Sequence, residues 1–188
     1  MSETRRLLEA ATALSHTLTA ASIPHAFHGS LLVAVLANLP TCNEILCIVE
    51  GGNTHPFRRV RQAVTGHESL TATNSPWTNR LHVTYHRVTP PINVEILPAG
   101  EEGPRRLDGS TVTTIRGLPF LTISEFVRAK IKARGLEHDA QDIVFALGRY
   151  WQLIDINRIL DQDMDKFVLR YPAAAQAWAA IKNRYGAR

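Results

Sequence analysis

Residues 27–50 of the sequence, FHGSLLVAVLANLPTCNEILCIVE, predict a strand end, a glycine turn, a short helix and a second strand. Gly29 has no Cβ, so the backbone can turn sharply there and approach a ligand closely. Ser30 stands where it would cap a helix over 31–39, which a proline then ends. The serine hydroxyl and the free amide N–H groups of the first helical turn would together form a seat for an anion. The apolar run 44–49 has the length and the β-branched content of a strand.

Outward from this stretch, the apolar pattern predicts an α/β (α+β) fold. Helical spacing of leucine and alanine indicates a first helix over 2–21. Alternation of apolar and polar residues over 80–88 and 92–97 predicts an antiparallel hairpin in which Glu95 faces away from the apolar stripe. The remainder, from about residue 121, reads as helices only. We therefore expect a small mixed β-sheet flanked by helices in residues 1–120, and a helical cap in residues 121–188 packed on it as one compact unit.

The composition is that of a soluble globular protein, with 188 residues, 45% apolar residues and a formal net charge of +4. The basic residues do not form the dense stripe with interleaved aromatics that a nucleic-acid site needs. No apolar run reaches bilayer length, and no secretory segment is recognisable, which favours a cytoplasmic protein without a membrane partner. Cys42 and Cys47 flank the turn at Glu44, and neighbours in a strand do not easily form a disulfide, so both are expected as free thiols in a reducing compartment.

The layout resembles the nucleotidyltransferase superfamily, which includes aminoglycoside nucleotidyltransferases and AbiEii-type toxins. In that family a Gly-Ser or Gly-Gly turn and a helix precede a strand bearing Asp-x-Asp, and a later strand supplies a third carboxylate. Here His28-Gly29-Ser30 matches the turn, Glu44-Ile45-Leu46 stands at the Asp-x-Asp position, and Glu95 stands at the third position. The resemblance extends through 118–130 and on to 139–147, roughly four-fifths of the chain.

The resemblance also implies two Mg²⁺ ions held between the carboxylates and the nucleotide phosphates. Glu44 can still ligate a metal, but Leu46 cannot, and it also removes a negative charge that would offset the cations. The metal motif is therefore degenerate, and we expect neither metal nor cofactor. A more apolar lining suits an organic ligand better than a metal triphosphate.

We therefore expect a cleft that binds a small organic substrate and acts as a metal-independent isomerase or cyclase of a biosynthetic pathway. Histidine as a residue type exchanges protons near neutral pH, and a lysine in the relatives points at phosphates. The expected catalytic residues are His28, Glu44 and Glu95. The expected ligand contacts are Gly29, Ser30, Leu46, Cys47, Trp77 and Lys130.

Each of these residues also has a plain structural interpretation. The glycine and serine could form an ordinary capped turn, and Glu95 could face solvent. His82 and His86 share one strand face but lack a third ligand, so we expect them to be exposed. Lys130 could simply be solvated, and the cysteine at position 47 could be an inert buried thiol.

Two other functions remain open at this point. The chain could be an active nucleotidyltransferase that uses Glu44 and Glu95 to hold Mg²⁺ with a nucleoside triphosphate. It could also be a non-catalytic pseudoenzyme that serves as a binding module. The sequence does not identify the substrate, and it leaves the oligomeric state open.

Overall fold

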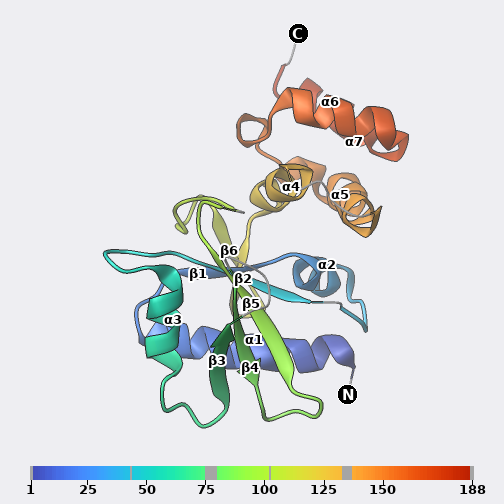
Figure 1. The fold of residues 1–188 in the computed structure, drawn as a ribbon. Helices are drawn as coiled ribbons and strands as arrows, with labels where there is room; N and C mark the ends of the chain where they lie inside the picture. Colours follow the sequence, from blue (N-terminus) through green and yellow to red (C-terminus); the bar gives the residue numbers. More distant parts are fainter. Residues whose placement is uncertain (1, 43, 75–79, 102, 133–136, 187–188) are drawn as a thin grey trace. The chain divides into compact units, whose positions relative to one another are not determined.

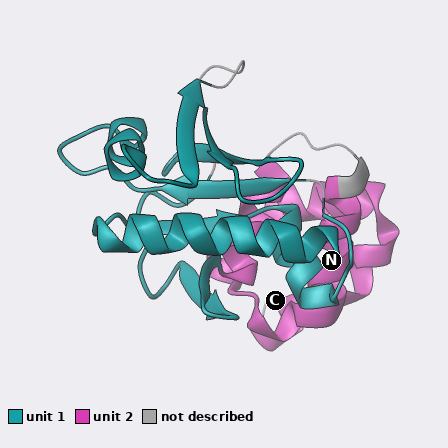
Figure 2. Ribbon diagram, turned by 90° about the horizontal axis from the view of Figure 1, so that it is seen from below, with its two compact units in different colours: residues 1–121 teal, residues 122–188 magenta. Residues whose placement is uncertain are grey.

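The structure is a computed structural model in which two compact units, Met1–Leu121 (unit 1) and Thr122–Arg188 (unit 2), are coloured separately in Figure 2. The residues that it describes are 2–42, 44–74, 80–101, 103–132 and 137–186, with the side chains of 137 and 138 excepted.

Unit 1 is a mixed α/β layer structure, as the sequence predicts (Figure 1). Its elements are α1 (Glu3–Ala20), β1 (His25–His28), α2 (Ser30–Ala37), β2 (Ile45–Val49), α3 (Pro56–Val64), β3 (Leu70–Asn74), β4 (Leu81–Tyr85), β5 (Ile92–Pro98), β6 (Val112–Ile115) and β7 (Leu118–Leu121). The strands form one sheet in the order β3-β4-β5-β2-β1-β7-β6. β2 runs parallel to β5, and β1 runs parallel to β7, whereas the remaining neighbours are antiparallel. The predicted antiparallel hairpin is therefore β4–β5.

The helices of unit 1 begin where the local sequence provides caps. The Ser2 hydroxyl accepts a hydrogen bond from the backbone amide of Arg5, at 3.2 Å, and so caps α1. Pro56 occupies the first turn of α3, where its missing N–H costs nothing. The cap of α3 is His55, whose ring accepts a hydrogen bond from the amide of Phe57.

One face of the sheet packs on the helices. Phe27 and His25 share this face, with ring centroids 6.1 Å apart, and the His25 ring reaches the hydroxyl of Ser15 on α1. Cys47 is the strand partner of Phe27 and therefore points to the same side. α1 contacts both α2 and α3, so the three helices form one continuous layer.

The opposite face carries a smaller apolar cluster of five buried side chains. Its members are Ala26, Leu46, Ile48, Leu97 and Leu121. The described part of the segment 99–112 packs on this cluster through Ala99, Leu107 and Val112. The Glu50 carboxylate holds the segment by accepting a hydrogen bond from the Leu107 amide at 2.9 Å. Gly103 lies so close that a Cβ there would stand 2.5 Å from the Ile48 Cδ1 atom.

Unit 2 is helical throughout its described residues. Its helices are α4 (Ile123–Lys132), α5 (Glu137–Tyr150), α6 (Asp161–Arg170) and α7 (Ala175–Arg184), with 3₁₀ turns at Trp151–Leu153, Ile156–Arg158 and Pro172–Ala174. Glu125 on α4 is buried, and Arg158 donates to its carboxylate at 2.7 Å. This ion pair joins the start of α4 to the second 3₁₀ turn.

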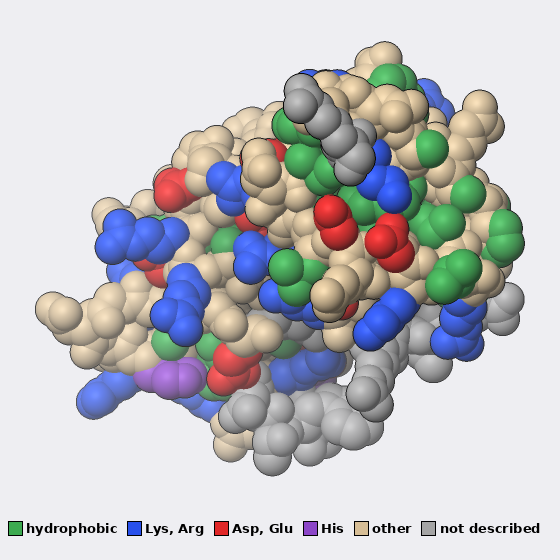
Figure 3. Space-filling model, turned by 90° about the horizontal axis from the view of Figure 1, so that it is seen from above, with side chains coloured by type: hydrophobic (Ala, Val, Ile, Leu, Met, Phe, Trp, Pro, Cys, Tyr) green, Lys and Arg blue, Asp and Glu red, His purple; other side chains and the backbone are tan. Residues whose placement is uncertain are grey.

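The surface is mixed in charge. In the space-filling view of Figure 3, Lys and Arg side chains stand in several groups, with acidic and apolar side chains between them. Among the described residues, no helix is both long enough and apolar enough to cross a lipid bilayer.

Candidate functional site

The glycine turn lies between β1 and α2. Gly29 has φ +84° and ψ −148°, a backbone conformation that L side chains rarely adopt, and it is the N-cap residue of α2. Ser30 is therefore the first helical residue and not the cap that the sequence indicated. Its hydroxyl donates to the backbone carbonyl of Glu44 at 3.3 Å and lies 3.3 Å from the Cys42 Sγ atom. Ser30 thus joins the start of the helix to the turn that leads into β2.

A row of four residues crosses the sheet on the face opposite the helices. His28 pairs with Leu46, Leu46 pairs with Glu95, and Glu95 pairs with His82, each on the adjacent strand. Directly paired residues of neighbouring strands point to the same face, and strands lie roughly 4.8 Å apart. We call His82, Glu95, Leu46 and His28 the cross-strand row. It spans three strand spacings, roughly 14 Å.

Three of the residues predicted for the site therefore come together in this row, namely His28, Leu46 and Glu95. Glu44 lies just before β2, two residues ahead of Leu46, and is half-buried. His28 is 2% exposed. Leu46 and Glu95, which the resemblance aligned with two of the family's carboxylates, are strand partners.

Leu46 occupies the space beside the glycine turn. It is 5% exposed, and a Cβ placed on Gly29 would lie 3.1 Å from its Cδ1 atom and 3.4 Å from its Cγ atom. An isobutyl group therefore lies beside the glycine turn, at the position that the resemblance aligned with a carboxylate. The backbone of the turn faces a hydrocarbon surface on this side.

Two side chains contact the Glu95 carboxylate, that of Arg80, just before β4, and that of His82, on β4. Arg80 Nη1 lies 2.5 Å from one carboxylate oxygen, and His82 Nε2 lies 3.3 Å from the other. The carboxylate side chain is 17% exposed. Its negative charge is therefore offset by a guanidinium group of the protein itself.

Sequence reasoning missed Arg80 and assigned His82 to the exposed surface together with His86. The register of the hairpin shows which residue of β4 lies opposite Glu95. Since Tyr85 pairs with Ile92 across the turn, three residues back along β4 must meet three residues forward along β5. That rule places His82 opposite Glu95.

Cys47 does not line the same wall as Leu46, which corrects the prediction that it contacts the ligand there. Adjacent residues of a strand point to opposite faces, and Cys47 points into the layer of helices. The thiol is fully buried, and burial raises the pKa of Cys47 far above the ordinary range. Cys47 is a core residue.

The two remaining predicted contacts cannot be placed beside the row. Trp77 lies outside the described residues. Lys130 belongs to unit 2, where it is 9% exposed and forms an ion pair with Asp139 at 2.9 Å. Its predicted role as a ligand contact stays a prediction.

The cross-strand row together with Glu44 does not fit the pair of magnesium ions that the resemblance implies. Magnesium needs several hard oxygen ligands in octahedral geometry. Two glutamates, Glu44 and Glu95, flank a leucine, and one of them is already paired with a guanidinium group. Within the residues that the structure describes, no group of three or more His, Cys, Asp and Glu side chains could hold a metal ion.

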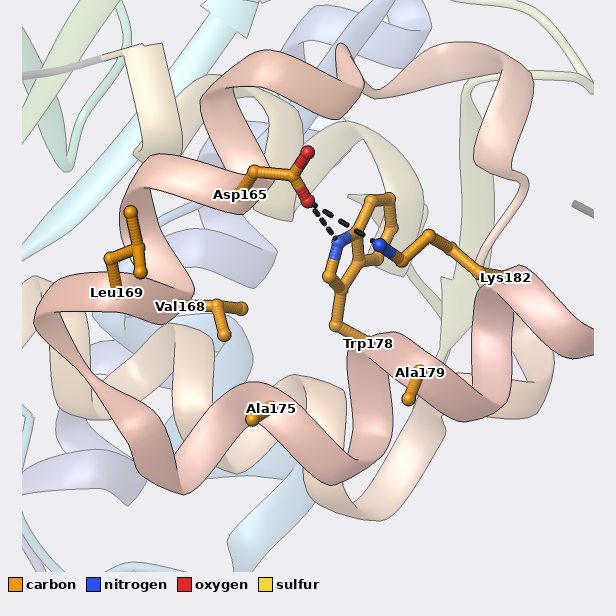
Figure 4. Close-up of a pocket in the computed structure, with 7 residues that line it drawn as sticks. All are labelled: Asp165, Val168, Leu169, Ala175, Trp178, Ala179 and Lys182. Atoms are coloured by element: carbon orange, nitrogen blue, oxygen red, sulfur yellow. Dashed lines mark hydrogen bonds and ion pairs between the residues drawn. The ribbon is translucent and has the colours of Figure 1, made fainter. Parts of the chain in front are cut away.

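Unit 2 carries a separate hollow of about 440 Å³ between α6 and α7 (Figure 4). Its lining residues are Asp165, Val168, Leu169, Ala175, Trp178, Ala179 and Lys182. The indole N–H of Trp178 donates to the Asp165 carboxylate at 2.9 Å, and Lys182 lies 3.5 Å from the same oxygen. The hydrogen bond from the indole lowers the pKa of Asp165. Both charged groups of this hollow are therefore paired with its own lining.

Comparison with known proteins supports the fold alone. Neither a protein-family model nor a curated protein matches the sequence. Among solved structures, the chain is similar to an antigenic nucleotidyltransferase-like protein from Paracoccidioides brasiliensis, with a TM-score of 0.64 and 14% identity over 94% of this chain and 93% of that one. The chain therefore has a nucleotidyltransferase-like fold, as the resemblance implied. At this identity the likeness says nothing about activity.

Proposed function

We propose that this nucleotidyltransferase-like chain binds a small organic molecule over the cross-strand row and acts on it without a metal ion, as an isomerase or cyclase of a biosynthetic pathway. His28, Glu44 and Glu95 would supply the polar contacts. Leu46 would supply the apolar wall, and Gly29 would let the ligand approach the backbone of the turn.

The observation that carries this proposal is the position of Leu46 against the glycine turn. A metal-dependent transfer needs anionic ligands at this point to hold two cations against the phosphates. The leucine offers hydrocarbon instead, with its Cδ1 atom 3.1 Å from where a Cβ on Gly29 would lie. The ion pair between Glu95 and Arg80 supports the same conclusion, because a cation of the protein already stands beside the third carboxylate position.

The chemistry of rearranging one organic molecule matches such a surface. Isomerisation and cyclisation need a fixed conformation, exclusion of water and one or two polar groups, rather than a cluster of cations. The row offers an apolar centre at Leu46 with polar side chains at both ends, His28 on one side and Glu95 with His82 on the other. A ligand about 10 Å long, which is two strand spacings, would reach from His28 to Glu95.

Thermal unfolding with added ligands tests the proposal. The wild-type protein is heated with ATP or CTP plus Mg²⁺, and with a panel of small apolar carbonyl compounds and carboxylic acids. We expect stabilisation by members of the panel and none by the magnesium nucleotides. A ligand present at a hundredfold excess over its Kd would add about 2.7 kcal/mol to the free energy of unfolding. Stabilisation by magnesium nucleotide would favour nucleotidyl transfer by Glu44 and Glu95 instead.

Two matched variants connect the result to position 46. Leu46→Asp restores the carboxylate of the family pattern, and Leu46→Asn introduces a side chain of the same shape without the charge. We expect both to lose stabilisation by the organic ligand, and only Leu46→Asp to gain stabilisation by Mg²⁺. Organic ligands that bind but are never converted would favour the non-catalytic binding module. The absence of any ligand response at all would contradict the proposal.

A further inference from the structure

We propose that His82 is the group that accepts and returns the proton in this reaction, with Nδ1 as the reacting atom and Glu95 as its positioning residue. The inference rests on the proposed function, since it assigns a role within the same row. His82 stands at the end of the cross-strand row, and its ring contacts the carboxylate that the family pattern reserves for metal. If Glu95 holds no metal ion, its carboxylate can instead orient the imidazole ring of His82.

The hydrogen bond between the two residues selects one tautomer of the ring. The oxygens of an ionised carboxylate only accept hydrogen bonds, so the contact of 3.3 Å requires Nε2 of His82 to carry the hydrogen. In the neutral ring, Nδ1 is then the unprotonated nitrogen. That atom is the proton acceptor, just as a carboxylate fixes the reacting nitrogen of a catalytic histidine in other enzymes.

The surroundings keep this pair in place while leaving the ring accessible. Arg80 holds the second oxygen of Glu95, so that the carboxylate cannot rotate away from His82. Both members of the pair lie inside strands of a seven-stranded sheet, which is more rigid than a loop. The His82 side chain is 18% exposed, and among the described residues its ring makes no second hydrogen bond. A small molecule lying over the row can therefore reach it.

The proton transfer needs no further reactant. Nδ1 takes a proton from a carbon next to a carbonyl group of the substrate, so that a C–H bond breaks and an N–H bond forms. The electron pair left on carbon delocalises into the carbonyl group. The imidazolium then returns the same proton to another carbon of the conjugated system, which moves the double bond and leaves the ring neutral. The positive charge that exists between the two steps lies next to the Glu95 carboxylate, which stabilises it.

The elimination of 5-nitrobenzisoxazole measures a positioned base directly and needs no natural substrate. The base removes the proton on carbon, the C–H electron pair completes a nitrile, and the N–O bond breaks to give a coloured phenolate. We expect His82→Gln to lower kcat/KM about a hundredfold, the range of a general base. His86→Gln is the control, since His86 follows the same strand, is exposed, and its ring lies 2.7 Å from the Thr71 hydroxyl, away from the Glu95 carboxylate. Equal rates for the wild type and His82→Gln, including no reaction in either, would overturn the role of His82 as a base.

Nitrogen-15 NMR of the imidazole rings gives a second measurement that needs no change at His82. We expect Nδ1 of His82 to be the unprotonated nitrogen in the neutral wild-type ring, and Glu95→Gln to give a mixture of both tautomers. The Nδ1–H tautomer in the wild type would overturn the positioning by Glu95. Neither measurement depends on a ligand from the thermal screen. The thermal screen can therefore yield no ligand while His82 still proves to be the base. The opposite outcome, a ligand in the screen but no role for His82, would be recognised in the same way.

Discussion

Replacing Gly29 by alanine tests the packing of Leu46 on the glycine turn. The added Cβ would meet Leu46 Cδ1 at 3.1 Å, which is tighter than ordinary van der Waals contact and forces the leucine to move by a few tenths of an ångström. The substitution also places a side chain on a backbone with φ +84°. Both effects act on the folded state, so Gly29→Ala should destabilise the protein.

The expected size follows from these two effects. A backbone conformation reserved for glycine costs an alanine about 1–3 kcal/mol. Displacing a buried leucine from a packed surface costs about 1 kcal/mol, the low end for overpacking, because only one atom has to move. The reduced freedom of the unfolded chain offsets about 0.4–1 kcal/mol. The free energy of unfolding should fall by about 2 kcal/mol in total.

Urea denaturation followed by circular dichroism measures this change, and two variants separate its causes. Gly66→Ala has a similar positive φ, +75°, but no atom within 4 Å of the added Cβ, so it reports backbone strain alone. Leu46→Ala removes the atom that Gly29→Ala would strike. The double variant Gly29→Ala/Leu46→Ala should therefore be less destabilised than the sum of the two single changes, by about 1 kcal/mol. Additive single changes, with Gly29→Ala no worse than Gly66→Ala, would refute the packing of Leu46 against the turn.

Three further predictions concern buried or paired polar side chains, two in unit 1 and one in unit 2. Burial lowers the pKa of His25, so its protonation favours the unfolded state; stability should fall as the pH decreases below about 6.5, by at most about 1.4 kcal/mol per pH unit. If His25→Gln lost as much free energy of unfolding at low pH as the wild type, measured by urea denaturation, the prediction would be wrong. Arg59→Ala should lose about 1–2 kcal/mol, since its guanidinium group donates to three backbone carbonyls of two loops, whereas exposed Arg58→Ala should change stability by less than about 0.5 kcal/mol. Glu125→Ala should cost about 2 kcal/mol because it removes the buried carboxylate that accepts from Arg158, whereas the partly exposed Arg158 keeps Asp155 at 3.5 Å; a melting temperature within a degree of wild type would contradict this.

Local patterns in the sequence predict most of the fold. The alternation over 80–88 and 92–97 gives β4 and β5, and the stretch from Phe27 to Glu50 gives the strand, turn, helix and strand in the correct order. The sequence pattern did not predict β3 and β7, because strands of four or five residues at or near a sheet edge show little periodicity. The resemblance that begins in this stretch implied the nucleotidyltransferase-like fold, and the similar solved structure confirms it.

The sequence by itself determined the residue types of the candidate site, above all the leucine at position 46, which the resemblance aligned with a carboxylate. Only the tertiary structure decided their partners. Strand register set Leu46 beside Glu95, brought His82 to the same carboxylate, and paired Cys47 with Phe27 on the face covered by the helices. These choices are non-local, because hydrogen bonds between strands distant in sequence fix them and no periodicity within a single strand records them.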